Sequence, residues 1–277
     1  MQNELQLIIK TSKALYGIDL APFDNAFLEQ AVDRRCVVLG VNDFQGYLET
    51  ITKNEAEADL LTRSLNITYT EFFRNTLTFA NLEQWLLPIL INSKPVGSEL
   101  RVWSAGCASG QEAYSIAMML ENAADKRSEP FRYRIIATDI SESALGFALK
   151  GEYSEEAVQA IRARDINQFF KRSGNTYTVC ERLKQHVSFS RYDLLDPLSA
   201  NPQESIFGNF DLVICSNVLF YYKPKCQSFI LGKLINSLVS NGYLITGEAE
   251  RRNVLKQGDL RAVVPPSPIF QKKAEVK

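Results

Sequence analysis

Apolar and polar positions follow two different periods along this chain, and the period changes between residues 75 and 95. In "AFLEQAVDRRCVVLG" the apolar residues recur every three or four positions up to Gly40, which predicts a helix with a glycine cap. The next stretch, "VNDFQGYLETI", predicts another helix, with Asn42 or Asp43 as its N-terminal cap. This region has no alternating strand pattern, so we predict an all-α N-terminal domain over residues 1–74.

Beyond residue 95 the pattern changes to strand-like runs separated by helix-like ones. The five strand-like runs are ELRVWSA, YRIIATDI, HVSFSRYDL, FDLVICSN and GYLITGEA. Strands that alternate with helices predict a parallel sheet covered by helices on both faces, which is the doubly wound α/β class. We therefore place a linker at residues 75–95 and a second domain at residues 96–277.

One segment of the second domain, from about residue 151 to 187, does not fit this alternation. It contains an acidic helix-like stretch, "SEEAVQAIRARDINQFF", and then "SGNTYTVCERLKQHV", which has a Gly-Asn turn between short alternating flanks. We predict a small antiparallel β subdomain inserted into the α/β domain.

Composition and charge narrow the class of protein. The 277 residues are 45% hydrophobic and 23% charged, an ordinary globular balance, and the net charge of −1 gives no general attraction to nucleic acid or to an anionic membrane. The five cysteines have no C-x-x-C spacing, which indicates neither a metal site nor a disulfide framework. The first residues lack a signal-peptide core, and no run approaches the roughly 20 apolar residues of a membrane span. These features predict a cytoplasmic protein that does not insert into membranes and does not bind nucleic acid.

The first strand-like run leads through "WSAGCASGQEAYS" into a helix, as a nucleotide-binding turn does. Its glycines, Gly106 and Gly110, have G-x-x-x-G spacing and lack the middle glycine that lets a dinucleotide pyrophosphate approach the backbone. Glu112 places a carboxylate at the helix start, where it repels phosphate and accepts hydrogen bonds from an amine. The turn therefore favours a nucleoside with an ammonium group over NAD. A purely structural turn, with Glu112 interacting with the helix dipole, is the alternative.

Polar residues also follow the next three strand-like runs, at the edge where open α/β sheets bind ligands. Asp139 can accept hydrogen bonds from ribose hydroxyls, or it caps the following helix, a role for which Ser141 is an equal candidate. The third and fourth runs end in Asp193, Leu194, Ser216 and Asn217. Four strands with polar residues at their carboxyl ends favour a binding site.

A nucleoside that carries an ammonium group and no phosphates points to S-adenosylmethionine. Its sulfonium is already a good leaving group, so methyl transfer needs an aligned nucleophile shielded from water more than it needs acid–base chemistry. A carboxylate acceptor, with a pKa of about 4.3, is ionised at neutral pH and requires no base. The chain has a single histidine, His186, at the start of a strand-like run, where we expect a partly exposed structural role.

Nine short motifs, spread over nearly the full length of the chain, occur in the order of a known family. They are DRRCVVLG, FQGYLETI, TEFFRN, WSAGCASGQEAYSIA, ATDIS, GEYS, RYDLLDP, FDLVICSNVLFYY and GYLITGEAE. On these motifs the chain resembles the CheR family of chemotaxis receptor methyltransferases. The resemblance implies a Rossmann-like S-adenosylmethionine-dependent methyltransferase domain. It also implies methyl transfer to glutamate side chains of the helical cytoplasmic domain of chemoreceptors, with S-adenosylhomocysteine as the product and no metal.

The resemblance assigns roles to individual residues. Arg74 of "TEFFR" reaches both the cofactor and the methyl-transfer centre, where a guanidinium can orient the incoming carboxylate, and Tyr221 is the tyrosine near the transferred methyl group. Glu112 binds the methionine amine, and Asp139 binds the ribose. The other residues assigned to the cofactor are Thr68, Thr70, Gly106, Asp193, Leu194, Asn217 and Val218. Without the resemblance, Arg74 is a surface charge and Tyr221 packs under the end of the sheet.

The chain departs from the family pattern at several positions. Ser216 stands where the family has an arginine that contacts the cofactor, and Glu248 stands where it has a histidine. The remaining departures are Thr68, Gln111 and Ala113. Two hypotheses therefore stay open: an active methyltransferase, and a degenerate module that binds cofactor or receptor without turnover.

The N-terminal region raises a separate question about the receptor. Family members present a basic helix face to an acidic receptor, but residues 1–74 hold 7 lysines and arginines against 11 aspartates and glutamates. Arg34 and Arg35 form either a local basic patch or an ordinary solvated helix face.

Overall fold

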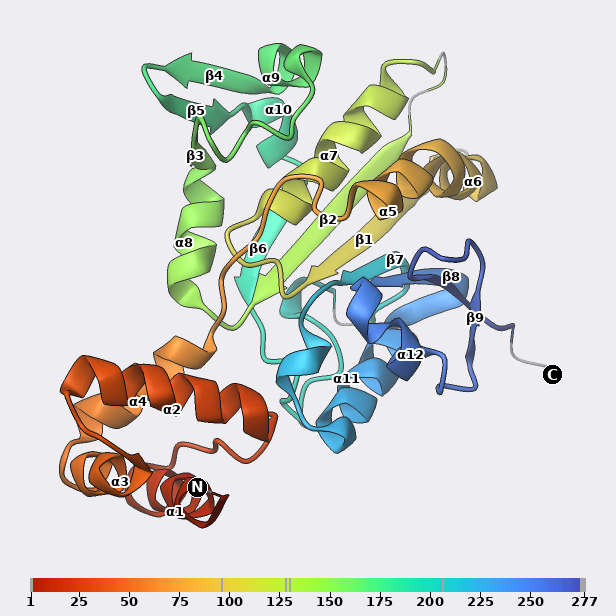
Figure 1. Cartoon of the computed structure of the whole chain (residues 1–277). Helices are drawn as coiled ribbons and strands as arrows, with labels where there is room; N and C mark the ends of the chain where they lie inside the picture. The colour runs from red at the N-terminus through yellow and green to blue at the C-terminus, as the bar shows by residue number, and fades with distance from the viewer. Residues whose placement is uncertain (1, 96, 128, 130, 206, 275–277) are drawn as a thin grey trace. The chain divides into compact units, whose positions relative to one another are not determined.

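The chain folds into two compact units. The computed structural model describes residues 2–95, 97–127, 129, 131–205 and 207–274 (Figure 1). One unit comprises Met1–Ile67 with Phe220–Ser228, and the other comprises Thr68–Leu219 with Phe229–Lys277. No helix among the described residues is long and apolar enough to cross a membrane.

The first unit is helical, as the sequence predicts. Its helices are α1 (Gln2–Tyr16), α2 (Asn25–Leu39), α3 (Phe44–Lys53) and α4 (Glu55–Leu65). The side chain of Asp24 accepts hydrogen bonds from two amides at the start of α2, and Gly40 ends this helix in the left-handed conformation. Asp43, one of the two predicted caps, accepts a hydrogen bond from the Gly46 amide at the start of α3. The apolar faces of the four helices meet in one buried cluster.

A buried ion pair joins α2 to α4 within this cluster. The guanidinium of Arg35 donates two hydrogen bonds to the carboxylate of Glu57, at 2.8 and 2.6 Å, and the hydroxyl of Tyr47 donates a third at 2.9 Å. Only 15% of the Arg35 side chain and 2% of the Glu57 side chain are exposed. Arg35 therefore stabilises the helical unit and belongs neither to a basic surface patch nor to a solvated face.

The second unit is built on a seven-stranded sheet with the order β6-β2-β1-β7-β8-β10-β9. Its strands are β1 (Glu99–Ala105), β2 (Arg132–Asp139), β6 (Val187–Arg191), β7 (Phe210–Cys215), β8 (Leu238–Thr246), β9 (Leu260–Ala262) and β10 (Ile269–Lys272). Strands β6, β2, β1, β7 and β8 run parallel to one another, and β10 runs antiparallel to β8 and β9. The five parallel strands are the five that the apolar pattern predicts, and the α/β class is confirmed.

Helices cover the sheet on both faces (Figure 1). They are α5 (Thr76–Asn81), the π-helical turn η1 (Leu82–Leu86), α6 (Leu87–Ser93), α7 (Gln111–Ala124), α8 (Glu142–Lys150), α11 (Pro224–Ser237) and α12 (Arg251–Val254). Leu100 and Val102 of β1 share a buried cluster with residues of α5, η1, α6 and α7. The segment that the sequence analysis assigned to a linker, residues 75–95, is thus largely helical and packs on the sheet. The predicted domain limits at residues 74 and 96 stay a prediction.

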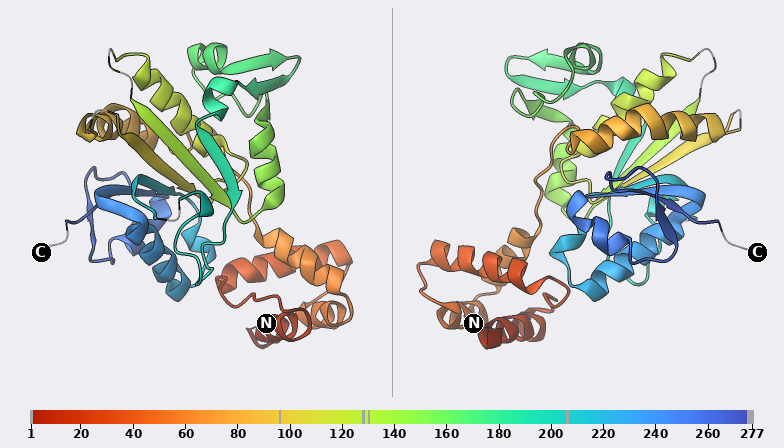
Figure 2. Two further views of the ribbon diagram at one scale, coloured as in Figure 1. Left: turned by 180° about the vertical axis from the view of Figure 1, so that it is seen from behind. Right: turned by 45° about the vertical axis from the view of Figure 1, so that its right-hand side comes forward.

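A three-stranded antiparallel sheet with the order β3-β5-β4 stands beyond the end of α8 (Figure 2). Its strands are β3 (Glu152–Ser154), β4 (Phe170–Ser173) and β5 (Thr176–Val179), accompanied by α9 (Ala163–Phe169) and α10 (Glu181–Lys184). The predicted inserted subdomain is therefore confirmed, with its hairpin turn at Gly174. Of the acidic stretch expected to be helical, only α9 forms a helix, and residues 155–161 form turns and a bend.

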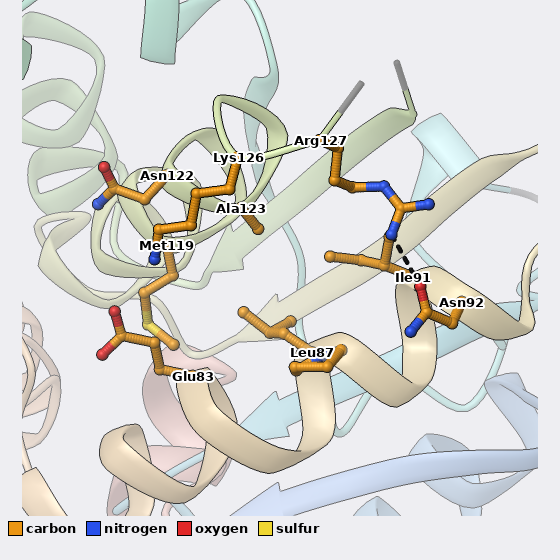
Figure 3. Close-up of a pocket in the computed structure, with 10 residues that line it drawn as sticks. Glu83, Leu87, Ile91, Asn92, Met119, Asn122, Ala123, Lys126 and Arg127 are labelled. Carbon is orange, nitrogen blue, oxygen red and sulfur yellow. Dashed lines mark hydrogen bonds between the residues drawn. The ribbon is translucent and has the colours of Figure 1, made fainter. Parts of the chain in front are cut away.

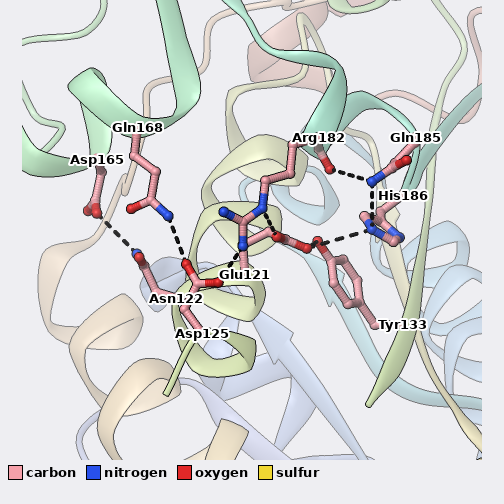
Figure 4. Close-up of polar contacts among 9 residues, drawn as sticks. All are labelled: Glu121, Asn122, Asp125, Tyr133, Asp165, Gln168, Arg182, Gln185 and His186. Atoms are coloured by element: carbon pink, nitrogen blue, oxygen red, sulfur yellow. Dashed lines mark hydrogen bonds and ion pairs between the residues drawn. The ribbon is translucent and has the colours of Figure 1, made fainter. Parts of the chain in front are cut away.

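A polar cluster joins this subdomain to α7 and β2 (Figure 4). At its centre is Glu121, a buried residue of α7, which accepts hydrogen bonds from the hydroxyl of Tyr133 at 2.6 Å and from the guanidinium of Arg182. His186 stacks on Tyr133, with ring centroids 4.3 Å apart, and its Nε2 lies 3.6 Å from Glu121. The single histidine of the chain is therefore a partly exposed structural residue, as its position in the sequence predicts.

Candidate functional site

The candidate site lies at the carboxyl ends of β1, β2, β6 and β7, which meet at one edge of the sheet. β1 is central, since it pairs in parallel with β2 on one side and with β7 on the other. The chain passes from β1 to β2 and then β6 in one direction, and β7 begins the other half of the sheet. Open α/β sheets bind ligands at such a switch point.

In the turn after β1, every second residue adopts the left-handed conformation: Gly106 (φ 78°), Ala108 (φ 47°) and Gly110 (φ 92°). The amides of Gly106 and Cys107 both donate to the carbonyl of Thr138 in β2, at 2.8 and 2.9 Å. A Cβ on Gly110 would lie 2.9 Å from the Cβ of Ala148 in α8. Glycine is thus required at position 110 by packing against a helix.

Asp139, at the end of β2, ties this turn to the second strand. Its Oδ2 accepts a hydrogen bond from the Ala108 amide at 2.8 Å, and its Oδ1 accepts one from the Ser141 amide at 2.9 Å. The cap of α8 is Ser141, whose hydroxyl accepts from the Ala144 amide. Burial raises the pKa of Asp139 while these amides oppose the shift. Each carboxylate oxygen keeps a further lone pair with which it can accept a ribose hydroxyl.

Glu112 lies in the first turn of α7, which begins after Gly110. Its Oε1 accepts a hydrogen bond from the hydroxyl of Ser104 in β1 at 2.6 Å. Burial raises the pKa of this carboxyl to about 7, against the lowering effects of the Ser104 hydroxyl, the Arg74 charge and the Ser216 hydroxyl. The raised pKa marks a carboxylate that a cationic group would stabilise.

In the motif "TEFFR" and directly after it, the residues on both sides of Arg74 have a constrained backbone or a buried side chain. Phe73 (φ 53°) and Asn75 (φ 64°) both adopt the left-handed conformation on either side of Arg74. Phe72 is buried against the edges of Tyr153 and Phe170, and the Phe73 amide donates to the hydroxyl of Ser115 in α7 at 3.0 Å.

Arg74 is partly buried and packs on Tyr69. Its guanidinium carbon is 5.5 Å from the ring centroid of Tyr69, and Nη1 donates to the Tyr69 carbonyl at 3.3 Å. Its charge also lowers the pKa of Glu112, so the two groups interact.

The loop after β7 packs against the glycine turn that follows β1. Asn217 adopts a left-handed conformation (φ 61°), and the side chain of Val218 lies against Gly106, where an added Cβ would be 2.6 Å from Val218 Cγ2. The carboxylate of Glu250 accepts hydrogen bonds from three consecutive amides of this loop, residues 217 to 219.

The remaining predicted residues are less closely tied to the turn. Asp193 accepts a hydrogen bond from the Leu195 amide, and Leu194 is buried; both follow Tyr192, whose amide donates to the Asp139 carbonyl. Thr68 is exposed and Thr70 is partly buried. Tyr221 falls in the segment that belongs to the helical unit, where its ring lies 4.7 Å from that of Phe27. Its role near a transferred methyl group stays a prediction.

Comparison with known proteins identifies the family of this chain. The family model described as "CheR methyltransferase, SAM binding domain" matches residues 68–263, and the one described as "CheR methyltransferase, all-alpha domain" matches residues 3–65. The chain belongs to the CheR methyltransferase family. It is therefore an S-adenosylmethionine-dependent methyltransferase, and the fold and cofactor predicted from the sequence are confirmed.

Individual relatives agree with this assignment. The chemotaxis protein methyltransferase of Borreliella burgdorferi is 31% identical over 262 residues, which cover 90% of this chain and 88% of the relative. The chemotaxis protein methyltransferase of Listeria monocytogenes is 29% identical over 251 residues, which cover 91% of each chain. An uncharacterized 104.1 kDa protein of Rhodobacter capsulatus is 32% identical over 223 residues, which make up 80% of this chain and 23% of that protein.

The residues of this CheR-family site fit the chemistry of the cofactor. S-adenosylmethionine has a cationic amine, ribose hydroxyls and no phosphate. Glu112 offers a buried carboxylate whose hydrogen-bond partners are hydroxyls, Asp139 offers carboxylate lone pairs, and Gly106 leaves no side chain at the turn. None of these groups would favour a phosphate. Among the described residues no group of three or more histidine, cysteine or acidic side chains could hold a metal ion.

Sequence reasoning missed three residues that shape this site. Ser104 and Ser115 are fully buried hydroxyls, which bond to Glu112 and to the Phe73 amide. Glu250 is a buried carboxylate in "GYLITGEAE". In this motif the sequence draws attention to Glu248, which departs from the family pattern, but Glu248 is exposed. A small polar residue within an apolar strand, as Ser104 is in "VWSA", is the one signal the sequence offers.

A separate cavity lies at the other end of α7 (Figure 3). It has a volume of about 200 Å³ and is lined by α7, η1 and α6, with Leu87, Ile91 and Met119 among its apolar residues. Glu83 on its rim is paired with Arg162 by two hydrogen bonds, at 2.8 and 2.6 Å. The cavity contains none of the predicted site residues.

Proposed function

We propose that this enzyme transfers a methyl group from S-adenosylmethionine to glutamate side chains in the helical cytoplasmic domain of a chemoreceptor. The observation that carries the proposal is a buried carboxylate, Glu112, at the carboxyl edge of the sheet, whose pKa is lowered by the charge of Arg74. The names of the relatives, chemotaxis protein methyltransferases, support a chemoreceptor as the substrate.

In this proposal Glu112 binds the amine of the cofactor and Asp139 binds its ribose. Asp193, Leu194, Asn217 and Val218 hold the adenosine end, and Thr68, Thr70 and Gly106 complete the contacts. The bound cofactor supplies a methyl group attached to a sulfonium. The sulfur is the leaving group, and it needs no proton in order to leave. The residues of the chain therefore need to align the acceptor and exclude water, not to move protons.

Arg74 is the residue proposed to align the acceptor. A guanidinium can bind one glutamate carboxylate through two parallel hydrogen bonds, which fixes the direction of the attacking oxygen. This guanidinium rests on the ring of Tyr69 and on a backbone carbonyl, contacts that an incoming carboxylate can replace. Tyr221 is retained in the proposal as the second residue near the methyl group.

The departure at Ser216 does not remove every polar contact from the site. Its hydroxyl makes a hydrogen bond that lowers the pKa of Glu112, which favours the ionised carboxylate that an amine requires. The site thus keeps a donor at this position in place of the arginine of the family. This supports turnover over the alternative of a binding module.

The proposal includes the domain roles predicted from the sequence. Residues 1–74 form a helical domain, and residues 96–277 form the methyltransferase domain, with its inserted subdomain at about 151–187. Residues 75–95 connect the two as a linker segment that is largely helical and packs on the sheet. We also propose a cytoplasmic location. All five cysteines of the chain are free thiols, which suits a reducing compartment.

The proposal is tested with cofactor labelled in its methyl group and a purified chemoreceptor cytoplasmic fragment. Methyl esters of glutamate are hydrolysed by base, so we expect label on the receptor that is released as volatile methanol on mild alkaline treatment. The matched control is Arg74→Lys, which keeps the charge and loses the paired donors. Bound cofactor without any base-labile label would instead identify a binding module.

A further inference from the structure

Four backbone amides converge on one buried side chain, Glu250, behind the loop that follows β7. Its Oε1 accepts hydrogen bonds from Val218 at 2.8 Å and Leu219 at 2.6 Å. Its Oε2 accepts hydrogen bonds from Gly247 at 2.7 Å and Asn217 at 3.2 Å. The side chain is 1% exposed, so these amides replace water as the carboxylate's hydrogen-bond donors.

The carboxylate holds the loop in its turn at Asn217. Asn217 has a φ of 61°, a left-handed conformation that asparagine adopts more readily than most residues, and in this conformation three consecutive amides of the loop donate to Glu250. The loop also lies close to the end of β8, because a Cβ on Gly247 would be 2.9 Å from Asn217 Nδ2 and 3.0 Å from the Asn217 amide nitrogen. Glu250 therefore determines where Asn217 and Val218 lie.

The position of Val218 in turn defines one side of the glycine turn. A Cβ on Gly106 would be 2.6 Å from Val218 Cγ2, so the two residues are already in contact without it. Gly106 is fixed from the other side, because its amide and that of Cys107 donate to Thr138 in β2. A shift of the loop therefore changes the spacing between β7 and the turn, where the candidate cofactor residues meet.

We propose that Glu250 is a positioning residue for the cofactor: its carboxylate sets the loop of residues 217–219 and, through Val218, the width of the adenosine site at Gly106. This inference rests on the proposed function, since it assumes that the cofactor binds at this edge of the sheet. Glu250 does not touch the cofactor in this proposal. Its effect on the shape of the site passes through Asn217 and Val218. The Glu250 charge also raises the pKa of Glu112, so its removal favours the ionised Glu112 that an amine requires and opposes the expected loss of affinity.

A second buried carboxylate provides a control for a merely structural role. Asp211 in β7 is 6% exposed, accepts a hydrogen bond from the Arg101 amide at 2.9 Å and pairs with Lys94 at 2.7 Å. Asp211 joins β1 to β7, much as Glu250 joins the loops that follow the strands. Asp211 lies near the amino ends of β1 and β7, away from the candidate cofactor residues. Asp211→Asn should therefore destabilise the protein without altering the cofactor site.

The test compares the affinity of the full chain for S-adenosylhomocysteine, measured by calorimetry at 15 °C, in wild type, Glu250→Gln and Asp211→Asn. An amide side chain has one acceptor oxygen and an NH2 group that would face amide donors, so the Glu250 variant cannot keep all four hydrogen bonds. We expect Glu250→Gln to weaken binding more than tenfold and Asp211→Asn to change it less than twofold, with both melting temperatures lowered. Equal weakening in both variants, or unchanged binding in Glu250→Gln, would overturn the proposal.

A second variant keeps the proposal testable if Glu250→Gln does not fold. Val218→Ala leaves the carboxylate and its four hydrogen bonds in place and removes the side chain that touches Gly106. We expect binding to weaken at least threefold with little change in melting temperature, and unchanged binding would contradict the inference. If wild type itself does not bind S-adenosylhomocysteine, the proposed function fails. If wild type binds and the variants match it, only the role of Glu250 fails.

Discussion

The hydroxyl of Ser104 donates a hydrogen bond to Glu112 across the gap between β1 and α7, with 2.6 Å between the two oxygens. This contact links the first strand of the sheet to the first turn of the helix that follows it. The carboxylate is held in place by a neutral partner in a buried setting, and its pKa is raised to about 7. It therefore changes charge in the physiological range, and two predictions follow from that property.

Cofactor affinity should depend on pH through Glu112. Only the ionised carboxylate can pair with the cofactor amine, so the dissociation constant of S-adenosylhomocysteine should rise as pH falls below 7, by up to about tenfold per pH unit. Calorimetry between pH 5.5 and 8.5 measures this change. In Glu112→Gln we expect weak binding with no such slope, whereas the exposed residue Glu142 can be changed to glutamine without effect. An affinity that is flat over this range in wild type would refute the assignment.

Glu112 should also lower the stability of the cofactor-free protein at high pH. Its pKa is about 7 in the folded chain and near 4.5 in the unfolded chain, so the folded state binds the proton more tightly. Rising pH therefore favours unfolding between these two values, and the effect is complete above about pH 7. A glutamine cannot lose a proton. The melting temperature of Glu112→Gln relative to wild type should be higher at pH 8 than at pH 5, and an equal difference at both pH values would contradict this account.

Arg74 should affect catalysis more than cofactor binding. Lysine keeps the charge but cannot form paired hydrogen bonds with a carboxylate, so we expect Arg74→Lys to lower kcat by at least roughly tenfold. The affinity for S-adenosylhomocysteine should change by less than about threefold, because no paired contact to the cofactor is lost. Arg172 is a matched control, since it also lies over a tyrosine ring and donates to a backbone carbonyl. The interpretation fails if Arg74→Lys retains full kcat or if Arg172→Lys shows the same loss.

The ion pair of Arg35 and Glu57 should contribute strongly to the stability of the helical unit. Removal of one partner leaves a buried charge, so Arg35→Met should lower the free energy of unfolding by ~3–5 kcal/mol. The neighbouring Arg34 is exposed, and Arg34→Met should change it by less than about 0.5 kcal/mol. Urea denaturation followed by circular dichroism measures both values. Similar losses of unfolding free energy in the two variants would show that the burial of Arg35 does not contribute to stability.

The elements that the sequence predicts well are those with a strong local signal. The cap at Gly40, the cap at Asp43 and the five parallel strands all follow from periodicity and capping chemistry within a few residues. The hairpin at Gly174 follows from its turn residues in the same way. Strands β9 and β10 are short and antiparallel, with β9 at the edge of the sheet and β10 next to it, and no alternation in their sequence marks them.

The features that the sequence did not predict depend on contacts between distant segments. Arg35 and Glu57 are 22 residues apart, and a helical period does not show which charged residue faces a partner. Glu250 binds amides more than 30 residues away, and main-chain donors leave no trace in a residue pattern. The left-handed conformation of Phe73 is imposed by burial of its neighbour and by the hydroxyl of Ser115. Motif resemblance, by contrast, named Arg74 and Glu112 without any of this geometry.

The central claim is that the residues at the carboxyl edge of this sheet methylate receptor glutamates. The most direct measurement is peptide mass spectrometry of a chemoreceptor cytoplasmic fragment incubated with the purified enzyme and S-adenosylmethionine. We predict methyl esters on glutamate side chains of the helical fragment, present with wild type and strongly reduced with Arg74→Lys. Methylation of another residue type, or an unmodified receptor despite bound cofactor, would contradict the account.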